Sequence, residues 1–216
     1  MRYVKGHGLQ TRNRIVEEAS YGLRQTGADG MSVAELMKLA GLTHGGFYAH
    51  FESREALVIE AFASAMDRTV SQWLNLMKGM PVEQRFDVIV ESYLSPAHRD
   101  DRSHGCVLPA MGADIARSSH KARRIFARKL NEMIEVVASL FPEKSPKEAR
   151  QIATGALATM MGSIVLARAV GDKKLSEDIL GAGRQALGGQ SAGRRAGVAS
   201  GVRRPNKSCK ERSDHD

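Results

Sequence analysis

Hydroxyl, imidazole and phenol side chains gather in one short segment, which reads THGGFYAHF over residues 43–51. Tyr48 and His50 carry a phenol and an imidazole, which can hydrogen-bond phosphate oxygens. Two adjacent glycines, Gly45 and Gly46, precede them, although a glycine in a helix interior costs about 1 kcal/mol relative to alanine. Without side chains the backbone can approach another surface closely, and the amides at a helix start suit an anion. The pattern therefore indicates contact with a phosphate-bearing surface.

Two short helices are expected to position this segment. The SVAE sequence that begins at Ser32 has the spacing of a capping box, so a helix is predicted over residues 33–40. Gly41 can end that helix in the left-handed conformation, and Thr43 is placed to cap a second helix that ends near His50. Two short helices joined by a glycine turn have the layout of a helix-turn-helix, whose second helix can enter the major groove.

Apolar residues are expected to hold this unit together. The residues predicted to join the two helices are Leu36, Leu39, Ala40 and Leu42. Phe47 and Phe51 lie four positions apart and are predicted to point inward, which turns Tyr48 and His50 outward. Ser53 is then predicted to cap a long helix that connects this unit to the rest of the chain.

The whole chain has helical rather than strand periodicity, and an all-α fold is predicted. The predicted helices span residues 11–25, 33–40, 43–50, 54–77, 82–94, 107–117, 120–140, 146–167 and 175–187. A loop rich in proline, histidine and aspartate is predicted over 95–105. The predicted units are a basic arm (1–9), a DNA-binding domain (10–62, with the helix-turn-helix over 33–52), a ligand-binding and dimerisation domain (63–187), and a disordered basic tail (188–216).

Composition excludes several classes of protein. The 216 residues are 42% hydrophobic and 26% charged, as in ordinary globular proteins. The start of the chain lacks the pattern of a secretory signal, and the stretch 151–167 is shorter than the roughly 20 apolar residues that span a bilayer. Cys106 and Cys209 do not have the spacing of a disulfide framework or a zinc site. A cytoplasmic protein without metal or cofactor is therefore expected.

The net charge of +8 indicates an anionic partner, but it is unevenly distributed. The predicted tail alone has seven basic and three acidic residues, which is half of the excess. Basic residues at the start of the chain, before Ile15, precede any acidic residue. The arm and the tail are therefore expected to add a salt-dependent attraction to phosphate rather than sequence recognition.

The segments GLTHGGFYAHF (41–51) and SREAL (53–57) closely resemble the DNA-binding segment of TetR/AcrR-family transcriptional regulators. The resemblance covers roughly residues 11–62, and the remaining chain is similar in length and layout to that family's helical ligand-binding and dimerisation domain. The YLSP and GCVL segments, from Tyr93 and Gly105, are similar to one subgroup with a Gly-Cys element. The resemblance implies a homodimeric, ligand-released repressor that binds a pseudo-palindromic operator.

The resemblance also assigns roles to individual residues. The predicted DNA contacts are Ser32, Thr43, His44, Gly45, Gly46, Tyr48, His50 and Arg54. His44 and Gly45 begin the helix that approaches bases, and Tyr48 and His50 match phosphate-contacting positions. Arg54 replaces the usual lysine, and Gly46 stands where the family more often has a side chain. His44 is therefore the best candidate for reading a base.

The second domain is expected to hold a small-molecule inducer and the dimer interface. The candidate ligand-binding residues are Trp73, Phe86, Tyr93, Cys106, Met111, Phe126 and Met160. The alternative for each of them is that it only packs in the hydrophobic core. The candidate interface residues are Gly155, Leu157, Gly162, Ile164, Leu166 and Ile179. The helix over 146–167 lacks charge in its later turns, and its small residues permit close helix approach.

Other functions stay open at this point. Cys106 lies just before a predicted helix, where the helix-end potential can lower a thiol pKa, so an electrophile- or oxidant-sensing repressor is one alternative and inert packing is another. An all-α enzyme in the second domain is also conceivable, but the sequence contains no assembled acid-base or nucleophile constellation. His98, Asp100, Asp101 and His104 could gather a metal, although a solvated loop explains them as well. The last alternative is a non-specific nucleic-acid binder that acts through the basic tail.

Overall fold

A computed structural model describes residues 5–27, 30 and 32–199, and every regular element in this part of the chain is a helix. In chain order the elements are α1 (Lys5–Thr26), α2 (Val33–Leu39), the 3₁₀ helix η1 (His44–Ala49), α3 (Arg54–Leu76), α4 (Val82–Tyr93), α5 (Pro96–Asp100), α6 (Leu108–Ala116), α7 (His120–Ala138), α8 (Pro146–Ala169) and α9 (Lys173–Ala199). The predicted all-α class is confirmed.

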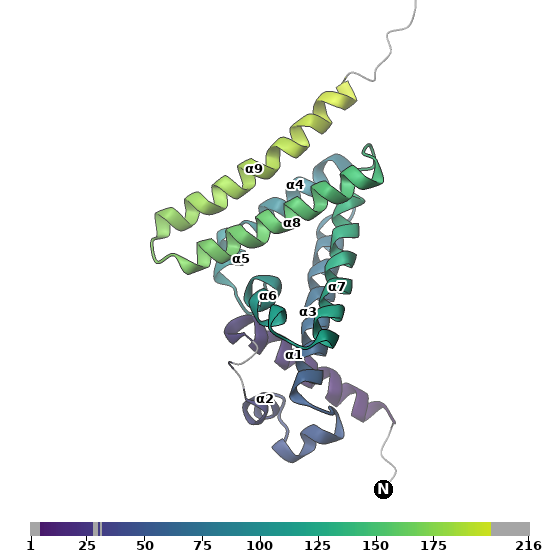
Figure 1. Ribbon diagram of the computed structural model, residues 1–216, viewed down its shortest axis with the longest axis vertical. Helices are drawn as coiled ribbons and strands as arrows, with labels where there is room; N and C mark the ends of the chain where they lie inside the picture. The colour runs from purple at the N-terminus through teal and green to yellow at the C-terminus, as the bar shows by residue number, and fades with distance from the viewer. Residues whose placement is uncertain (1–4, 28–29, 31, 200–216) are drawn as a thin grey trace, which may run out of the picture.

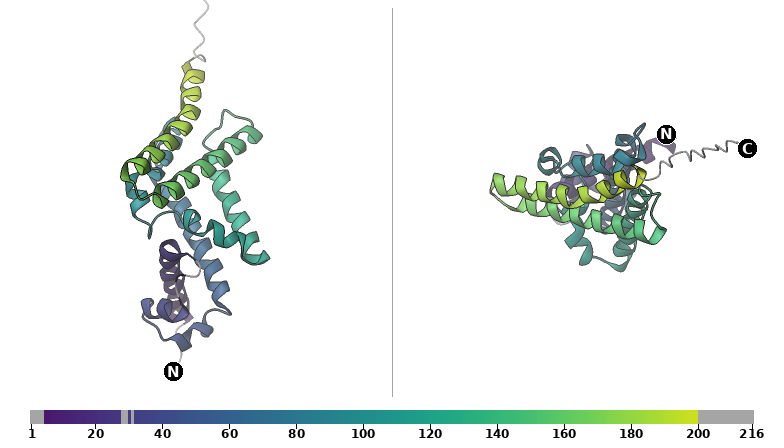
Figure 2. Two further views of the ribbon diagram at one scale, coloured as in Figure 1. Left: turned by 60° about the vertical axis from the view of Figure 1, so that its left-hand side comes forward. Right: turned by 90° about the horizontal axis from the view of Figure 1, so that it is seen from above.

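The helices form a small lower unit and a larger upper unit that share α3 (Figure 1). In the lower unit α1 packs across α3, and α2 contacts both α1 and η1. In the upper unit α7 packs along α3, and α8 contacts α6, α7 and α9. Figure 2 shows α8 and α9 side by side, with the lower unit at the opposite end of the molecule.

One hydrophobic cluster runs through both units, from Ile15 in α1 to Leu187 in α9. The predicted stripe on α1 is confirmed, because Ile15 and Ala19 are almost completely buried. The apolar spacing of α3 is confirmed as well, since Leu57 and Trp73, near its two ends, are both buried. Because α3 is anchored in both units, one continuous helix connects them.

The ends of the chain contain more helix than predicted. Helix α1 begins at Lys5, so part of the predicted arm is helical, and α9 continues to Ala199, beyond the predicted start of the tail at 188. Once a helix is anchored, each further residue adds a hydrogen bond at little cost, so helices can extend past their last packed turn. Residues 1–4 of the arm and 200–216 of the tail lie outside the described residues.

Two further segments differ from the sequence prediction. The predicted loop 95–105 contains α5, because Ser95 accepts a hydrogen bond from the His98 amide and Pro96 occupies the favoured first helical position. Helix α8 reaches Ala169, so it has the length and composition to cross a membrane, although the same test is passed by core helices of soluble proteins. A third of its most apolar window is buried here, so the helix is covered on one side rather than enclosed.

Candidate nucleic-acid interface and adjoining cavity

The capping box predicted at the start of α2 is present. The Ser32 hydroxyl accepts the Glu35 amide at 3.2 Å, and the Ser32 amide donates to the Glu35 carboxylate at 2.9 Å. Hydrogen bonds from Ser32 lower the pKa of the Glu35 carboxyl. Gly41 has a φ of +67° and reverses the chain, and the Leu42 amide then donates to the Met37 carbonyl at 2.8 Å. These local bonds fix the turn between α2 and η1.

The second element is a 3₁₀ helix rather than the predicted α-helix. Thr43 is extended at its start, but the Thr43 side chain makes no capping hydrogen bond, so the predicted cap is wrong. The Thr43 hydroxyl is left exposed to solvent. Adjacent glycines disfavour a full α-helix here, and three residues per turn place Gly45 and Tyr48 on the same face.

Aromatic packing holds η1 in place. Phe47 and Phe51 are 1% and 3% exposed, and their rings stack with centroids 5.7 Å apart, as their spacing predicted. The Arg12 guanidinium lies 4.6 Å from the centre of the Phe51 ring and forms an ion pair with Glu60 of α3. Tyr48 contacts Phe47 edge-on, yet 70% of its surface stays exposed. The exposed Tyr48 side chain is therefore held by packing against the buried Phe47 ring.

The two glycines of η1 have no role in the protein's own packing. A Cβ atom added at Gly45 would meet nothing within 4 Å, and one added at Gly46 would make only an ordinary contact with Met37. Neither glycine has a positive φ. Because the fold requires glycine at neither position, the bare backbone is available for close approach by an external surface.

The predicted DNA contacts differ in how far they are exposed. Thr43, His44, Gly45 and Tyr48 are exposed, whereas Gly46, His50 and Arg54 are half-buried. Ser32 is exposed, but its hydroxyl is already engaged in the capping box.

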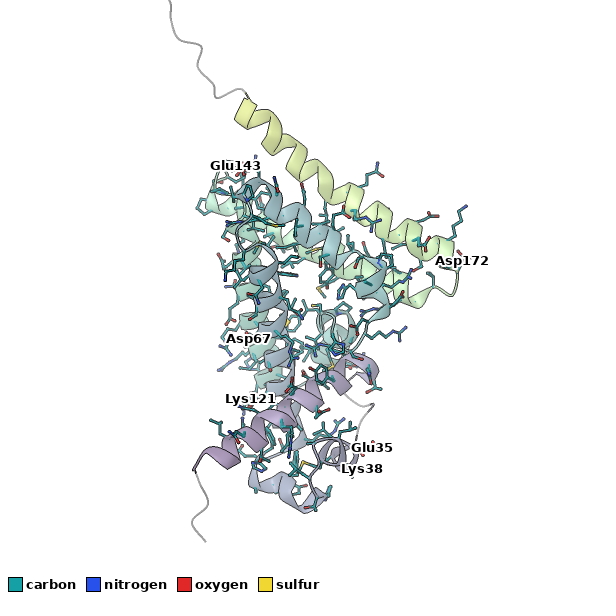
Figure 3. All side chains as sticks on the ribbon, turned by 180° about the vertical axis from the view of Figure 1, so that it is seen from behind. Glu35, Lys38, Asp67, Lys121, Glu143 and Asp172 are labelled. Atoms are coloured by element: carbon teal, nitrogen blue, oxygen red, sulfur yellow. The ribbon has the colours of Figure 1, made fainter. Side chains whose placement is uncertain are left out.

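Two residues of α2 differ from the sequence prediction. Leu39 was predicted to join the helices, but it is 58% exposed, and Met37 fills the inner position instead. A helix of only seven residues presents few positions to the core, and here Leu36, Met37 and Ala40 occupy them while Leu39 lies on the outer side. Lys38, exposed in the last turn of α2, is a further cation near the interface that the motif comparison did not single out (Figure 3).

A cavity of about 410 Å³ lies between α3, α4 and the segment 95–106. Of the candidate ligand-binding residues, Trp73, Tyr93 and Cys106 line it. The lining residues that sequence reasoning missed are Thr69, Gln72, Leu76, Ser92, Ser95, Ala97, His98, Asp101, His104 and Gly105. Three of these, His98, Asp101 and His104, had been noticed only as a metal cluster, and no metal-binding group occurs among the described residues.

The other candidate ligand-binding residues pack elsewhere in the core. Phe86 contacts Phe141 edge-on at 5.0 Å, and Phe126 stacks on Phe62 at 5.7 Å. Met111 and Met160 are fully buried and do not line this cavity. Large apolar side chains at helical spacing are needed first to fill the space between helices, so spacing alone could not distinguish them from cavity residues.

A half-buried histidine, His98, builds the inner wall of the cavity. His98 Nδ1 lies 2.6 Å from the Tyr93 carbonyl, and the Cys106 amide donates to His98 Nε2 at 3.0 Å. Nδ1 therefore carries the proton, and burial lowers the pKa of His98. A Cβ atom at Gly105 would lie 2.6 Å from Nε2, so glycine is required there for close approach.

The other inner polar groups are neutral too. Burial raises the pKa of the Tyr93 hydroxyl well above its ordinary value, and it raises the pKa of the Cys106 thiol. The Cys106 result is opposite to the lowered pKa on which the thiol-sensor alternative was based, because desolvation outweighs the helix-end potential. The Tyr93 hydroxyl is buried without a nitrogen or oxygen partner among the described residues, and it faces the thiol.

The outer side of the same wall touches the lower unit. Ser103 accepts hydrogen bonds from Gln25 Nε2 at 2.6 Å, on its hydroxyl, and from Arg24 Nη1 at 3.3 Å, on its carbonyl. The His104 ring contacts the Tyr21 ring edge-on at 5.2 Å. The segment 101–106 therefore lies between the cavity and α1.

The candidate dimer residues divide between two faces of α8. Gly155, Gly162 and Leu166 are exposed, and Ile179 of α9 is half-buried. Leu157 and Ile164, in contrast, are 3% and 0% exposed because they fill the core of their own chain, so they are not available to a partner. Val165 and Leu175, which were not among the candidates, extend the exposed apolar surface.

Comparisons with known proteins agree with this geometry. Residues 15–61 match the model of bacterial regulatory proteins, tetR family. The chain is 24% identical over 127 residues to the HTH-type transcriptional repressor DhaR of Mycobacterium sp. (strain GP1), which is 57% of this chain and 62% of that protein. It is 29% identical over 82 residues to the uncharacterized HTH-type transcriptional regulator YdgC of Bacillus subtilis, which is 37% of this chain and 42% of that protein. The chain thus matches less than two thirds of the length of either relative.

Solved structures with the same fold cover nearly the whole chain. A TetR transcriptional regulator from Chloroflexus aurantiacus superposes with a TM-score of 0.70 at 24% identity, covering 84% of this chain and 94% of its own. Escherichia coli NemR in its reduced form gives a TM-score of 0.70 at 18% identity and covers 82% and 95%. At these identities the likeness concerns the arrangement of the helices.

Proposed function

We propose, from the premise that this chain is a member of the tetR family of bacterial regulatory proteins, that it is a sequence-specific DNA-binding transcriptional regulator. The observation that carries the proposal is the exposed side of η1: His44, Gly45 and Tyr48 are exposed, while Phe47 of the same helix and Phe51 just after it are buried. A short rigid element of this kind can lie in the major groove while neighbouring groups hold the phosphates.

The exposed groups suggest a division of work at the DNA. We assign base contact to the His44 imidazole and close backbone approach to Gly45, where no Cβ is present. Tyr48, His50 and the Thr43 hydroxyl would bind phosphate oxygens, with Arg54 and Lys38 supplying charge. Ser32 contributes by capping α2, because its hydroxyl is already engaged with Glu35.

The protein is proposed to act as a homodimer through the exposed faces of α8 and α9. One short reading element makes too few base contacts for strong specificity, and two copies on a pseudo-palindromic operator double them. Gly155 and Gly162 have no side chains, so another helix can approach α8 closely there. The exposed side chains of Val165 and Leu166 on α8 and Leu175 on α9 are apolar. Such a surface on a monomer marks an interaction site.

The cavity beside α3 is proposed to bind a small inducer that has an apolar body and a neutral, hydrogen-bonding head. Trp73 and Leu76 offer apolar surface, and the exposed side chains of Gln72 and Ser92 offer neutral hydrogen-bonding groups. His98 and Cys106 are neutral, and Asp101, the carboxylate in the lining, is already paired with His104, so a neutral head group fits the inner wall best. A ligand that moved the segment 101–106 would act on α1 through Ser103, and so favour the conformer that misfits DNA.

Repression is proposed as the sign of regulation, which agrees with the name of the relative DhaR. The competing functions have less support. The enzyme alternative has less support because the Asp101–His104 pair beside the cavity is exposed on both sides, and the nearby Cys106 thiol is buried with a raised pKa. The thiol-sensor alternative is weakened by the burial and the raised pKa of Cys106.

Binding to DNA from upstream of the protein's own gene tests the proposal. Wild type should shift this DNA in the presence of excess unrelated DNA, and a His44→Ala/Tyr48→Ala variant should not. Both side chains are exposed, so the variant should unfold at the wild-type temperature. A matched control, Asn75→Ala/Lys78→Ala, removes exposed side chains at the upper end of α3 and should bind normally.

Two results would favour the alternatives. Equal DNA binding by the wild type and the His44→Ala/Tyr48→Ala variant would contradict the proposed interface at η1. A variant that lacks only residues 200–216 keeps α9 intact. If this variant lost all DNA binding, the non-specific binder that attaches through its basic tail would be favoured over the η1 interface.

A further inference from the structure

A second cavity of about 290 Å³ lies between the turn that follows α5 and the turn that joins α8 to α9. Its charged lining residues are Arg99, Asp100, Arg102, Arg168, Asp172 and Lys173. Four cations therefore face two carboxylates. The lining thus carries an excess of two positive charges.

Both carboxylates of the cavity are already engaged. Asp100 accepts two hydrogen bonds from the guanidinium of Arg99, at 2.7 and 2.9 Å. Asp172 accepts the Leu175 amide at 2.6 Å and so caps the start of α9. Glu177, outside the lining, lies 4.0 Å from Lys173 in a pair that is exposed on both sides, where such pairs are weak.

Arg168 is the most constrained of the remaining cations. The Arg168 Nε donates to the Arg99 carbonyl at 3.0 Å, and its Nη2 donates to the His98 carbonyl at 2.8 Å. These partners are neutral, while burial and the nearby guanidinium of Arg102 lower the pKa of Arg168. A guanidinium held in place beside a like charge is a favourable partner for an anion, since oxyanions accept charge-assisted, often bidentate hydrogen bonds from arginine.

We infer that this cavity, the α8–α9 anion site, binds a small doubly charged oxyanion, namely a phosphate group. A phosphate carries nearly two negative charges at neutral pH, which matches the excess charge of the lining, and its oxygens can meet cations from several sides. The inference does not depend on the proposed DNA binding. Figure 3 shows Asp172 at the end of the molecule away from Glu35 and Lys38 of α2, so DNA held at η1 does not supply this phosphate.

The site also has a structural consequence. The short segment 97–102 separates the two cavities. Ala97, His98 and Asp101 line the cavity beside α3 that contains Trp73 and Tyr93, which we call the aromatic cavity. Arg99, Asp100 and Arg102 line the anion site. A bound phosphate would bridge this segment to the start of α9. It would thereby stiffen the wall that holds His98.

Calorimetric titration of the full chain with inorganic phosphate, at constant ionic strength in chloride, tests the inference. Wild type should bind one phosphate per chain. The Arg102→Gln/Lys173→Gln variant should bind at least about tenfold more weakly, because each lost charge-assisted contact is worth roughly a factor of ten. Arg168 is left in place because its bonds to two carbonyls also hold the turn.

The control variant Arg123→Gln/Arg124→Gln removes the same charge from the exposed face of α7 and should bind like wild type. A second titration with glycerol 3-phosphate identifies the source: tighter binding than inorganic phosphate indicates an organic phosphate, and weaker binding indicates the free ion. Equal phosphate affinity in wild type and Arg102→Gln/Lys173→Gln, or no saturable binding by wild type, would overturn the inference.

Discussion

Tyr48 shows how one side chain is prepared for a partner outside the fold. Its ring leans edge-on against buried Phe47, while its hydroxyl end lies on the exposed side of η1. Gly45, on the same face, leaves space around it. The fold therefore fixes the direction of a polar group that it does not itself use.

Removing that hydroxyl should weaken DNA binding without affecting the fold. Tyr48→Phe is expected to cost about 1 kcal/mol of binding free energy, the usual worth of one hydrogen bond. The loss should be similar for all DNA sequences, because phosphates carry no sequence information. Fluorescence anisotropy with specific and scrambled duplexes measures it, and a loss confined to the specific duplex would contradict the phosphate role.

His98 makes the wall of the aromatic cavity sensitive to acid. Burial lowers the pKa of His98 in the folded chain, so the unfolded chain binds the proton more readily. The stability due to neutral His98 is therefore present above the unfolded value, about 6.5, and is lost as the pH falls below it. Unfolding free energy should decrease more steeply from pH 7 to pH 5 in wild type than in His98→Gln. The exposed control His120→Gln should keep the wild-type slope, and parallel curves for wild type and His98→Gln would rule the effect out.

Among the elements, α2 and α8 begin with the same device. Ser32 with Glu35, and Ser145 with Glu148, form capping boxes in which each serine accepts the amide three residues later. Both were predicted from the sequence, because the box is a local pattern whose partners lie within one turn. Helix η1 was harder to predict: its boundaries were nearly correct, but the α-helix expected there is a 3₁₀ helix, which agrees with the low helix propensity of its adjacent glycines.

The two capping boxes provide a matched pair of variants. Ser32→Ala and Ser145→Ala should each lower the unfolding free energy by about 1 kcal/mol, the typical worth of an N-cap. The cap also stabilises the ionised glutamate, so part of its contribution should vanish as the pH falls through the lowered pKa of Glu35 or Glu148.

Only Ser32→Ala should weaken DNA binding, since α2 supports η1 whereas α8 lies in the upper unit. Urea unfolding and anisotropy on both variants distinguish the effects. A large loss of binding in Ser32→Ala without loss of stability would instead make Ser32 a direct DNA contact.

At the scale of the whole molecule, the exposed face of α8 is where we propose that two copies meet. Leu166→Glu places a charge on the surface where two copies are proposed to meet, so like charges oppose each other across the two-fold axis. The dimer dissociation constant should rise at least about tenfold. Sedimentation of the variant measures this, with Leu74→Glu on α3, of similar exposure, as a control that should stay dimeric. An unchanged dimer in Leu166→Glu would exclude this face.

The contact between the cavity wall and α1 predicts an effect at a distance. Gly105→Ala would place a Cβ against His98 and displace the wall without any ligand. DNA binding should weaken by roughly 0.5–2 kcal/mol, the range found for residues that couple distant sites. Gln25→Ala, which cuts the bond to Ser103, should remove part of that loss in the double variant.

The control for the Gly105→Ala and Gln25→Ala variants is Gly112→Ala on α6, where an added Cβ meets nothing within 4 Å. It should bind DNA like wild type. Full DNA affinity in Gly105→Ala, despite a lower unfolding temperature, would show that the wall does not communicate with α1.

The sequence by itself determined the helical class, both capping boxes and the inward pair Phe47 and Phe51, and it singled out the segment that we propose faces DNA. These features depend on residues within one or two helical turns, where spacing alone fixes which groups meet. It could not determine which apolar residues line a cavity, which side of α8 stays open, or whether Cys106 is acidic. Those properties depend on burial by distant elements, so only the tertiary structure placed His98 behind Cys106, turned Leu157 inward and gathered four cations between α5 and α9.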